Sequence, residues 1–290
     1  MEAGLTEKQG GKWRVAAGLA PVILLGAQCS WAGVLGTAGL WGLLILVSPG
    51  DSKPRNGILR ALILGLTAAE TMHAVRESWP GAGQQWIPVI LGILALWAAI
   101  RGGEQAAQGS ILLLWPAGIL LGAVLLSGLG EIQMENLKPV QLELKPVSGL
   151  LTVLLIIYIG GNGEKKAKGS LWGKLTAVGL SSALVTQGVL AGRLQMENPN
   201  PFYLMGRSVD LLGKMKRMES LILLGMLLGI YLWMTYLMVW IGEGKAKKLI
   251  TAAGAAALYM SGIRVPMGMI PVLVILTEYL IPAMQAAHEK

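Results

Sequence analysis

The fold is decided by the stretch Leu96–Val140, which reads LWAAIRGGEQAAQGSILLLWPAGILLGAVLLSGLGEIQMENLKPV. An apolar segment ends at Ile100, a short polar step follows, and residues 110–129 then contain no charged side chain. About 20 apolar residues cross the hydrocarbon core of a bilayer as an α-helix. Pro116 removes a backbone hydrogen bond from the second helix and predicts a kink there. The stretch therefore predicts two membrane-spanning helices that are joined by a tight turn at Gly102–Gly103.

The composition also indicates a membrane protein. Hydrophobic residues make up 54% of the chain and charged residues 14%, whereas soluble domains contain about 25% charged residues. The net charge of +8 would suggest a nucleic-acid partner in a soluble protein. Here the basic residues lie between apolar segments, so we expect contact with membrane lipid and no nucleic acid. The single cysteine, Cys29, excludes an internal disulfide and a cysteine-based metal cluster.

We predict an all-α integral membrane protein with about ten transmembrane helices. Residues 1–14 are expected to form a cytoplasmic N-terminus, 15–284 a single membrane domain with halves 15–145 and 146–284, and 285–290 a cytoplasmic C-terminus. The first apolar run continues into further spans, so it is not expected to be a cleaved signal peptide. The apolar segments are 15–31, 33–48, 58–73, 86–101, 110–129, 146–161, 171–191, 219–242, 248–263 and 265–284.

One point of this topology stays open. Residues 15–48 fit either two spans or one long broken element, and the choice reverses the orientation of everything that follows. With two spans and an inner N-terminus, most Lys and Arg residues fall on the inner side, which is the cytoplasmic side by the positive-inside rule.

The basic loop 193–217 falls on the outer side in this topology. Its apolar residues are spaced for an amphipathic helix on the membrane surface, and its positive charges suit an acidic partner or lipid headgroups. Glu219 lies just beyond the loop, where the helix dipole favours a negative charge and where Lys216 or Arg217 could pair with it.

Three segments resemble spore germination permeases, the multispan B subunits of nutrient germinant receptors. These segments read AAIRGGEQAAQGSILLLWPAGILL, ENLKPV and NPFYLMGRSVDLLGKMKRMESLI. The family belongs to the amino acid–polyamine–organocation superfamily. The residues that match its motifs are Arg101, Glu104, Pro116, Asn136, Pro139, Arg217 and Glu219.

The resemblance implies two inverted five-helix repeats in a leucine-transporter-like arrangement. It also implies a receptor subunit in the spore inner membrane that senses a small nutrient such as an amino acid. Its partners would be a second membrane subunit and a lipoprotein, and it would have no enzymatic activity and no cofactor. The alternatives are a free-standing secondary amino acid transporter and a degenerate scaffold without ligand binding.

In such a fold the ligand binds where the first and sixth spans break, because open backbone groups there bind charged ends of the ligand. The chain lacks the glycine-rich break followed by proline that the family has in its first span, and its sixth span is short. Small residues also serve close helix packing, which is the competing interpretation. The candidate ligand residues are Gly26, Gln28 and Ser30 in the first span and Ser148, Gly149 and Thr152 in the sixth.

Two acidic residues are candidates for ion or proton coupling. Glu278 lies inside an uncharged segment, so it is expected to face the bundle or a cavity rather than lipid; snorkelling at the inner interface is the alternative. Glu70 shares a helical face with His73 and Glu77. That face could hold a metal or a proton, but we favour the polar outer end of the third span, and we expect no metal site.

Overall fold

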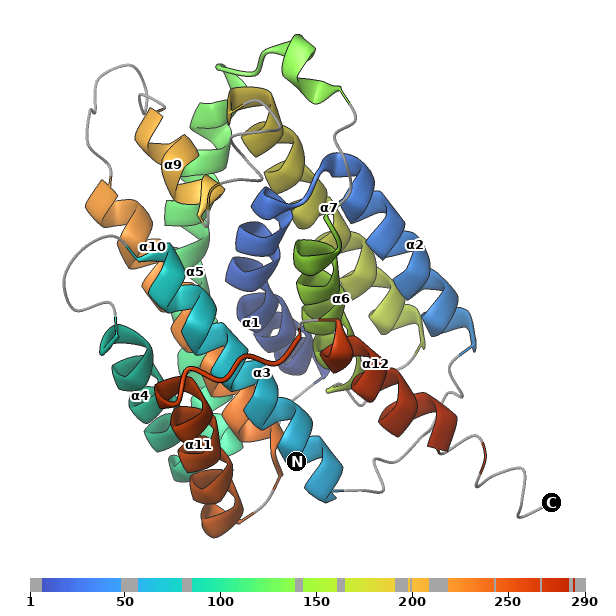
Figure 1. Ribbon diagram of the computed structural model, residues 1–290, viewed down its shortest axis with the longest axis vertical. Coiled ribbons are helices and arrows are strands. Elements are labelled where there is room, and N and C mark those ends of the chain that lie inside the picture. The colour runs from blue at the N-terminus through green and yellow to red at the C-terminus, as the bar shows by residue number, and fades with distance from the viewer. Residues whose placement is uncertain are drawn as a thin grey trace.

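The structure, a computed structural model, describes residues 7–47, 57–79, 85–138, 143–160, 165–190, 198, 200–208, 219–242, 244–266, 268–281 and 284. Within these residues the chain is all-helical (Figure 1). The helices are α1 (Glu7–Gln28), α2 (Trp31–Val47), α3 (Gly57–Ser78), α4 (Ile87–Arg101), α5 (Gly103–Leu129), η1 (Met134–Leu137), α6 (Leu144–Ile159), α7 (Lys165–Leu190), α9 (Pro201–Ser208), α10 (Glu219–Trp240), α11 (Lys245–Met260), α12 (Met269–Ile275) and the π-helical extension η2 (Leu276–Leu280).

Each of the ten predicted apolar segments falls on a helix, the last of them on α12 with η2. Residues 15–48 form two helices, because the chain breaks at Cys29–Ser30. Of the expected cytoplasmic N-terminus, residues 1–14, residues 7–14 belong to α1. Trp13 is buried and packs edge-on against Tyr236 at 5.0 Å between ring centroids, which explains why the helix begins so early.

Several helices have the length or the surface of membrane-spanning elements. Three of them, α3, α5 and α10, are long and apolar enough to cross a bilayer. Large apolar side chains are also exposed on the outward faces of α2, α4 and α5, an exterior that soluble monomers rarely have and that lipid would cover. These side chains are Leu35, Leu40, Leu43 and Leu46 on α2, Ile90, Ile93, Leu94 and Trp97 on α4, and Leu112, Trp115, Ile119 and Leu126 on α5.

Helix α1 lies at the centre of the bundle and contacts α5, α6, α7 and α10. Small residues bring these helices close together. A Cβ atom added at Gly229 of α10 would lie 2.1 Å from Cβ of Ala20, and one added at Gly26 would lie 2.7 Å from the carbonyl oxygen of Gly179. Backbones that approach this closely gain dispersion contacts, the usual role of small residues in membrane helices.

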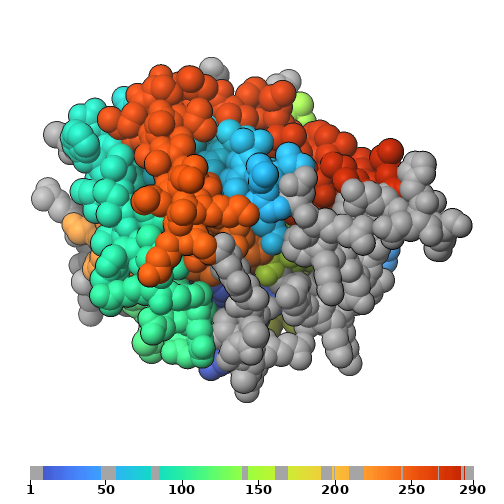
Figure 2. Space-filling view, turned by 90° about the horizontal axis from the view of Figure 1, so that it is seen from below, coloured from blue at the N-terminus to red at the C-terminus, as the bar shows by residue number. Residues whose placement is uncertain are grey.

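The remaining helices pack around this centre and against one another. Helix α3 packs on α11, α4 and α5 pack on α10, α2 packs on α6 and α7, and α12 packs on α6 and α3. In Figure 1, α1 begins and α12 ends toward the same lower end of the bundle. Seen from below, α3, α4, α5 and α11 lie next to one another at this end (Figure 2).

The motif that contains Asn136 forms a cap over the opposite end of the bundle. Asn136 Nδ2 donates a hydrogen bond to the carbonyl of Gly188 at 2.9 Å, and Gln187 Nε2 donates to the carbonyl of Asn136 at 3.1 Å. Trp31 Nε1 donates to the carbonyl of Leu137 at 3.0 Å. Asn136 thus ties η1 to the end of α7, and Leu137 ties it to the start of α2.

Candidate functional site

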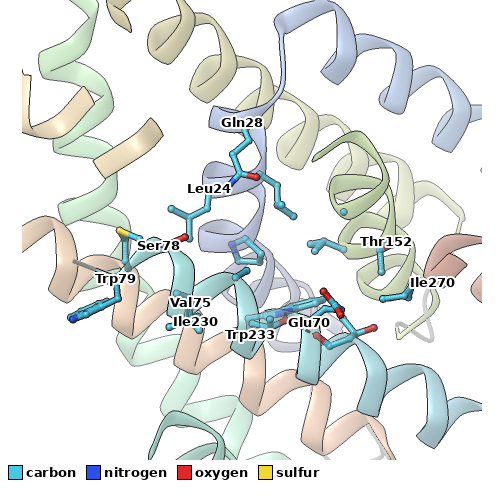
Figure 3. Close-up of a pocket in the computed structure, with 18 residues that line it drawn as sticks. Leu24, Gln28, Glu70, Val75, Ser78, Trp79, Thr152, Ile230, Trp233 and Ile270 are labelled. Carbon is cyan, nitrogen blue, oxygen red and sulfur yellow. Dashed lines mark hydrogen bonds between the residues drawn. The ribbon is translucent and has the colours of Figure 1, made fainter. Parts of the chain in front are cut away.

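A cavity lies between α1, α3, α6 and α10 (Figure 3). The empty space within it, which includes open solvent at its mouth, is about 780 Å³. Apolar side chains form most of its wall. Four of the predicted site residues line it: Gln28 from α1, Glu70 from α3, and Gly149 and Thr152 from α6.

The candidate break of the first span, residues 26–30, is present only at its carboxyl end. Helix α1 continues through Gly26 to Gln28, and the break falls after it, at Cys29–Ser30. Gly26 packs against the backbone of Gly179 instead of lining the cavity. Ser30 directly precedes α2, and its Oγ accepts a hydrogen bond from the N–H of Gly33 at 3.2 Å. Of the three candidates in this span, only Gln28 reaches the cavity.

The expected break in the sixth span is absent, because α6 is continuous from Leu144 to Ile159. Ser148 Oγ donates to the carbonyl of Leu144 at 2.7 Å, and Thr152 Oγ1 donates to the carbonyl of Ser148 at 2.8 Å. Hydroxyl groups that bond to the carbonyl four residues earlier can remain inside a helix without opening it. Ser148 lies outside the cavity, whereas Gly149 and Thr152 form part of its wall.

Glu70 is buried at the cavity wall, with 6% of its surface exposed. Its Oε1 accepts a hydrogen bond at 2.8 Å from the N–H of Val265, in the segment between α11 and α12. Within the described residues, its second oxygen has no hydrogen bond. Glu70 therefore presents a carboxylate oxygen at the edge of an apolar cavity.

The interpretation of this face of α3 as a wet helix end is wrong for Glu70 and His73. Helix α3 extends to Ser78, so both residues lie inside the bundle. His73 packs against the ring of Tyr259 at 5.1 Å, and Glu77 forms an exposed ion pair with Arg264. Among the described residues no three His, Cys, Asp or Glu side chains are grouped to hold a metal ion.

Sequence reasoning missed a row of hydroxyl groups on α3. Thr71 Oγ1 donates to the carbonyl of Thr67 at 2.7 Å and accepts a hydrogen bond from Trp233 Nε1 of α10 at 3.2 Å. Thr67, Thr71 and Ser78 all line the cavity beside Glu70. Their spacing of four and seven residues places them on one helical face, and this pattern could have identified the face as polar.

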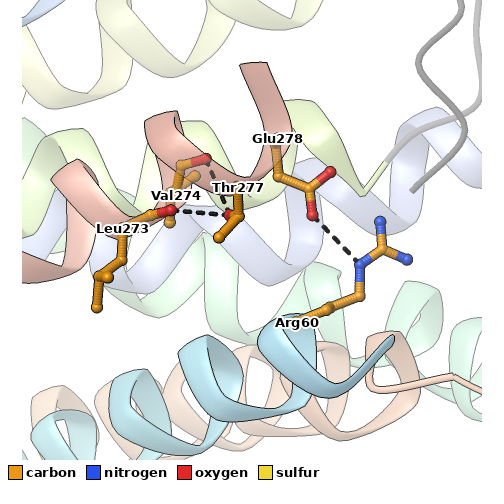
Figure 4. A network of polar contacts seen from close by, with 5 residues as sticks. All are labelled: Arg60, Leu273, Val274, Thr277 and Glu278. Carbon is orange, nitrogen blue, oxygen red and sulfur yellow. Dashed lines mark hydrogen bonds and ion pairs between the residues drawn. The ribbon is translucent and has the colours of Figure 1, made fainter. Parts of the chain in front are cut away.

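Glu278 forms a second polar site, apart from the cavity (Figure 4). Its Oε1 lies 3.6 Å from Arg60 Nε of α3, and the two side chains are 11% and 15% exposed. The Arg60 guanidinium also lies 4.3 Å from the centroid of the Trp240 ring. The expectation that Glu278 faces protein rather than lipid is confirmed. It lies in η2, and such π-helical turns occur frequently at functional sites.

The first family motif forms the turn between α4 and α5. Gly102 adopts a φ of 143°, which lets the chain reverse between the two helices. Arg101 stacks over Trp97 at 3.9 Å, and Glu104 accepts a hydrogen bond from Gln108 Nε2 at 3.3 Å. Pro116 is exposed on the outer face of α5, which remains helical through it. None of these residues lines the cavity.

The third of the segments that resemble the family includes most of the basic loop 193–217, for which we predicted a surface helix. Of this loop only residues 198 and 200–208 are described; they contain α9, which buries Phe202 and Met205 and packs on α1, α7 and α10. Glu219 pairs with Arg207 of α9 at 3.2 Å, whereas Lys216 lies outside the described residues. Arg217 and Pro139 lie outside the described residues.

Comparison with known proteins assigns no family to this chain. No protein-family model matches it, and no curated protein matches it either. Its function is therefore inferred from its own residues and their geometry.

Proposed function

We propose that this protein is the permease-like membrane subunit of a spore germinant receptor and that it binds a small nutrient in the cavity between α1, α3, α6 and α10. The observation that carries this proposal is the cavity itself. It brings together Gln28 of the first helix and Gly149 and Thr152 of the sixth, two segments far apart in the chain, within an all-helical bundle that has an apolar exterior. The motifs around Arg101, Asn136 and Glu219 add the resemblance to germination permeases.

The pairing of the helices supports two five-helix repeats. If α1–α5 correspond to α6, α7, α10, α11 and α12 in order, the contacts match in pairs. Helix α1 packs on α7 as α6 packs on α2; α4 packs on α10 as α11 packs on α3; and α5 packs on α1 as α12 packs on α6. Inverted repeats with a ligand site between them are a common architecture of secondary transporters.

The distribution of charge supports a location in the cell membrane, here the spore inner membrane. Helix α4 ends with the exposed Arg101 and α11 begins with the exposed Lys245. In Figure 1 these helix ends lie toward the lower end of the bundle, toward which α1 begins and α12 ends. Short basic segments of this kind remain in the cytoplasm. Both termini would then be cytoplasmic.

As a receptor subunit, the protein would act through a shift in its conformation. A ligand changes an equilibrium only when it binds one arrangement more tightly than another. Occupation of the cavity would favour one packing of α1 and α6 against α3 and α10. A second membrane subunit and a lipoprotein subunit would then respond to that packing.

One observation favours a secondary transporter as the alternative. Glu70 places a buried carboxylate at the cavity wall, and buried acidic groups in membrane bundles commonly belong to ion or proton pathways. In that case the protein would move its ligand across the membrane without partner subunits.

Deletion of the gene in its host tests the receptor proposal. We expect the deleted strain to lose germination triggered by at least one nutrient and to contain less of the lipoprotein partner. Normal germination with every nutrient tried, at an unchanged level of the lipoprotein, would refute the receptor function. Uptake of labelled nutrient by the purified protein in liposomes would then support the transporter.

A further inference from the structure

The described wall of the cavity carries an acidic side chain and no basic one. Among the described residues that line it, Glu70 is the ionisable one, and Lys, Arg and His are absent. The nearby guanidinium of Arg264 is paired with Glu77 on the exposed side of α3. A ligand in the cavity therefore meets a buried carboxylate and no described basic side chain.

Most hydroxyl donors in the wall are already used. Thr67, Thr71 and Thr152 each donate their hydroxyl hydrogen to a carbonyl on their own helix, at 2.7–2.8 Å. The indole N–H of Trp233 is donated to Thr71. These hydroxyl groups keep oxygen lone pairs, so toward a ligand they act as hydrogen-bond acceptors.

The helix ends around the cavity also favour a positively charged ligand. Helix α1 ends at Gln28 and α3 ends at Ser78, and both residues line the wall. The carboxyl end of a helix carries a partial negative charge, which favours cations. Ile270 is the one lining residue from the first turn of a helix, and the next residue, Pro271, has no N–H to offer.

We propose that the ligand of this cavity is an apolar monoamine that carries an ammonium group and no carboxylate. This inference rests on the proposed function, because it assumes that the cavity is the ligand site. The ammonium group would pair with Glu70, and the apolar body would lie against Leu24, Val75 and Ile230, which line the same cavity. The carboxylate of an amino acid would be buried beside Glu70 without a described cation, and an unpaired buried charge is costly. The amino acid expected from the family resemblance is thus the less suitable ligand.

A matched series of four compounds tests this chemistry on the purified full-length protein in lipid nanodiscs. The compounds are 2-phenylethylamine, phenylalanine, 3-phenylpropanoate and 2-phenylethanol, and isothermal titration calorimetry measures their binding. We expect 2-phenylethylamine to bind at least ten times more tightly than the other three. Glu70→Gln should weaken binding of the amine at least tenfold and leave binding of 2-phenylethanol unchanged. Glu77→Gln on the exposed side of the same helix should change neither.

Far-UV circular dichroism and thermal unfolding without ligand will show whether Glu70→Gln is folded. Gln keeps an oxygen that can accept the hydrogen bond of the Val265 N–H. Phenylalanine or 3-phenylpropanoate binding as tightly as the amine would overturn the amine assignment and leave the cavity as a ligand site. Amine binding that is unaffected by Glu70→Gln in a folded protein would overturn it as well. If none of the four compounds binds, the assignment is also wrong, and the germination phenotype of the deleted strain decides separately whether the receptor function stands.

Discussion

We expect the ion pair between Arg60 and Glu278 to hold α3 against η2, so that substitutions at the two residues have non-additive effects on the free energy of unfolding. Removing one partner of a fully buried pair costs about 3–5 kcal/mol, because the other charge is left unpaired. These side chains are 15% and 11% exposed and 3.6 Å apart, so we expect about 2 kcal/mol for Glu278→Leu and a similar loss for Arg60→Met. The double variant should lose no more than about 1 kcal/mol, since apolar residues that replace both partners leave no unpaired charge.

Reversible unfolding in mixed micelles, titrated with sodium dodecyl sulfate, measures these free energies. The exposed pair of Glu77 and Arg264 is the matched control, because it also joins α3 to the C-terminal part of the chain. Exposed pairs contribute about 1 kcal/mol or less, so its variants should change the free energy of unfolding by no more than that. If the double variant at Arg60 and Glu278 loses as much as the two single variants combined, the two residues are not coupled and the reasoning fails.

Two further predictions concern packing and the cap at η1. Gly229→Ala should destabilise the protein by about 1–3 kcal/mol, because its Cβ atom would clash with Ala20. Gly36→Ala is the control: it adds a methyl group in open space and should stabilise α2 by up to about 1 kcal/mol. Equal effects of the two substitutions on thermal unfolding would contradict the close contact between Gly229 and Ala20. Gln187→Leu should cost about 1–3 kcal/mol, because the carbonyl of Asn136 loses its donor. Hydrogen exchange should then become faster in residues 133–138, and unchanged exchange rates there would argue against the role of Gln187.

The hydrophobic pattern was sufficient to predict which segments are helical, because apolar runs such as residues 110–129 have few other stable forms in a membrane. It could not predict where the helices end. Helix α1 begins at Glu7 although its first turns carry Lys8 and Lys12. Tertiary packing of Trp13 on Tyr236 explains this extension, and a contact between residues so far apart in the chain is not visible in the local pattern.

The site was predictable in part. Gln28, Glu70 and Thr152 were identified as candidates, and all three line the cavity. Gly26 and Ser148 do not, because a small residue or a hydroxyl group suits a helix break, a packing contact and a bond to the preceding turn equally well. Only the three-dimensional structure distinguishes these uses.

The measurement that tests the central claim most directly is nutrient-triggered germination of spores that carry Ala74→Phe. Ala74 lines the cavity on α3 and makes no side-chain hydrogen bond, so the new ring occupies the ligand space without removing a polar contact. Ile58→Phe, on an exposed position of the same helix, is the control. With equal amounts of both proteins in the spore, we expect Ala74→Phe to abolish the response to a nutrient that still triggers the control. A full response to every nutrient with phenylalanine at position 74 would contradict the claim that the nutrient binds in this cavity.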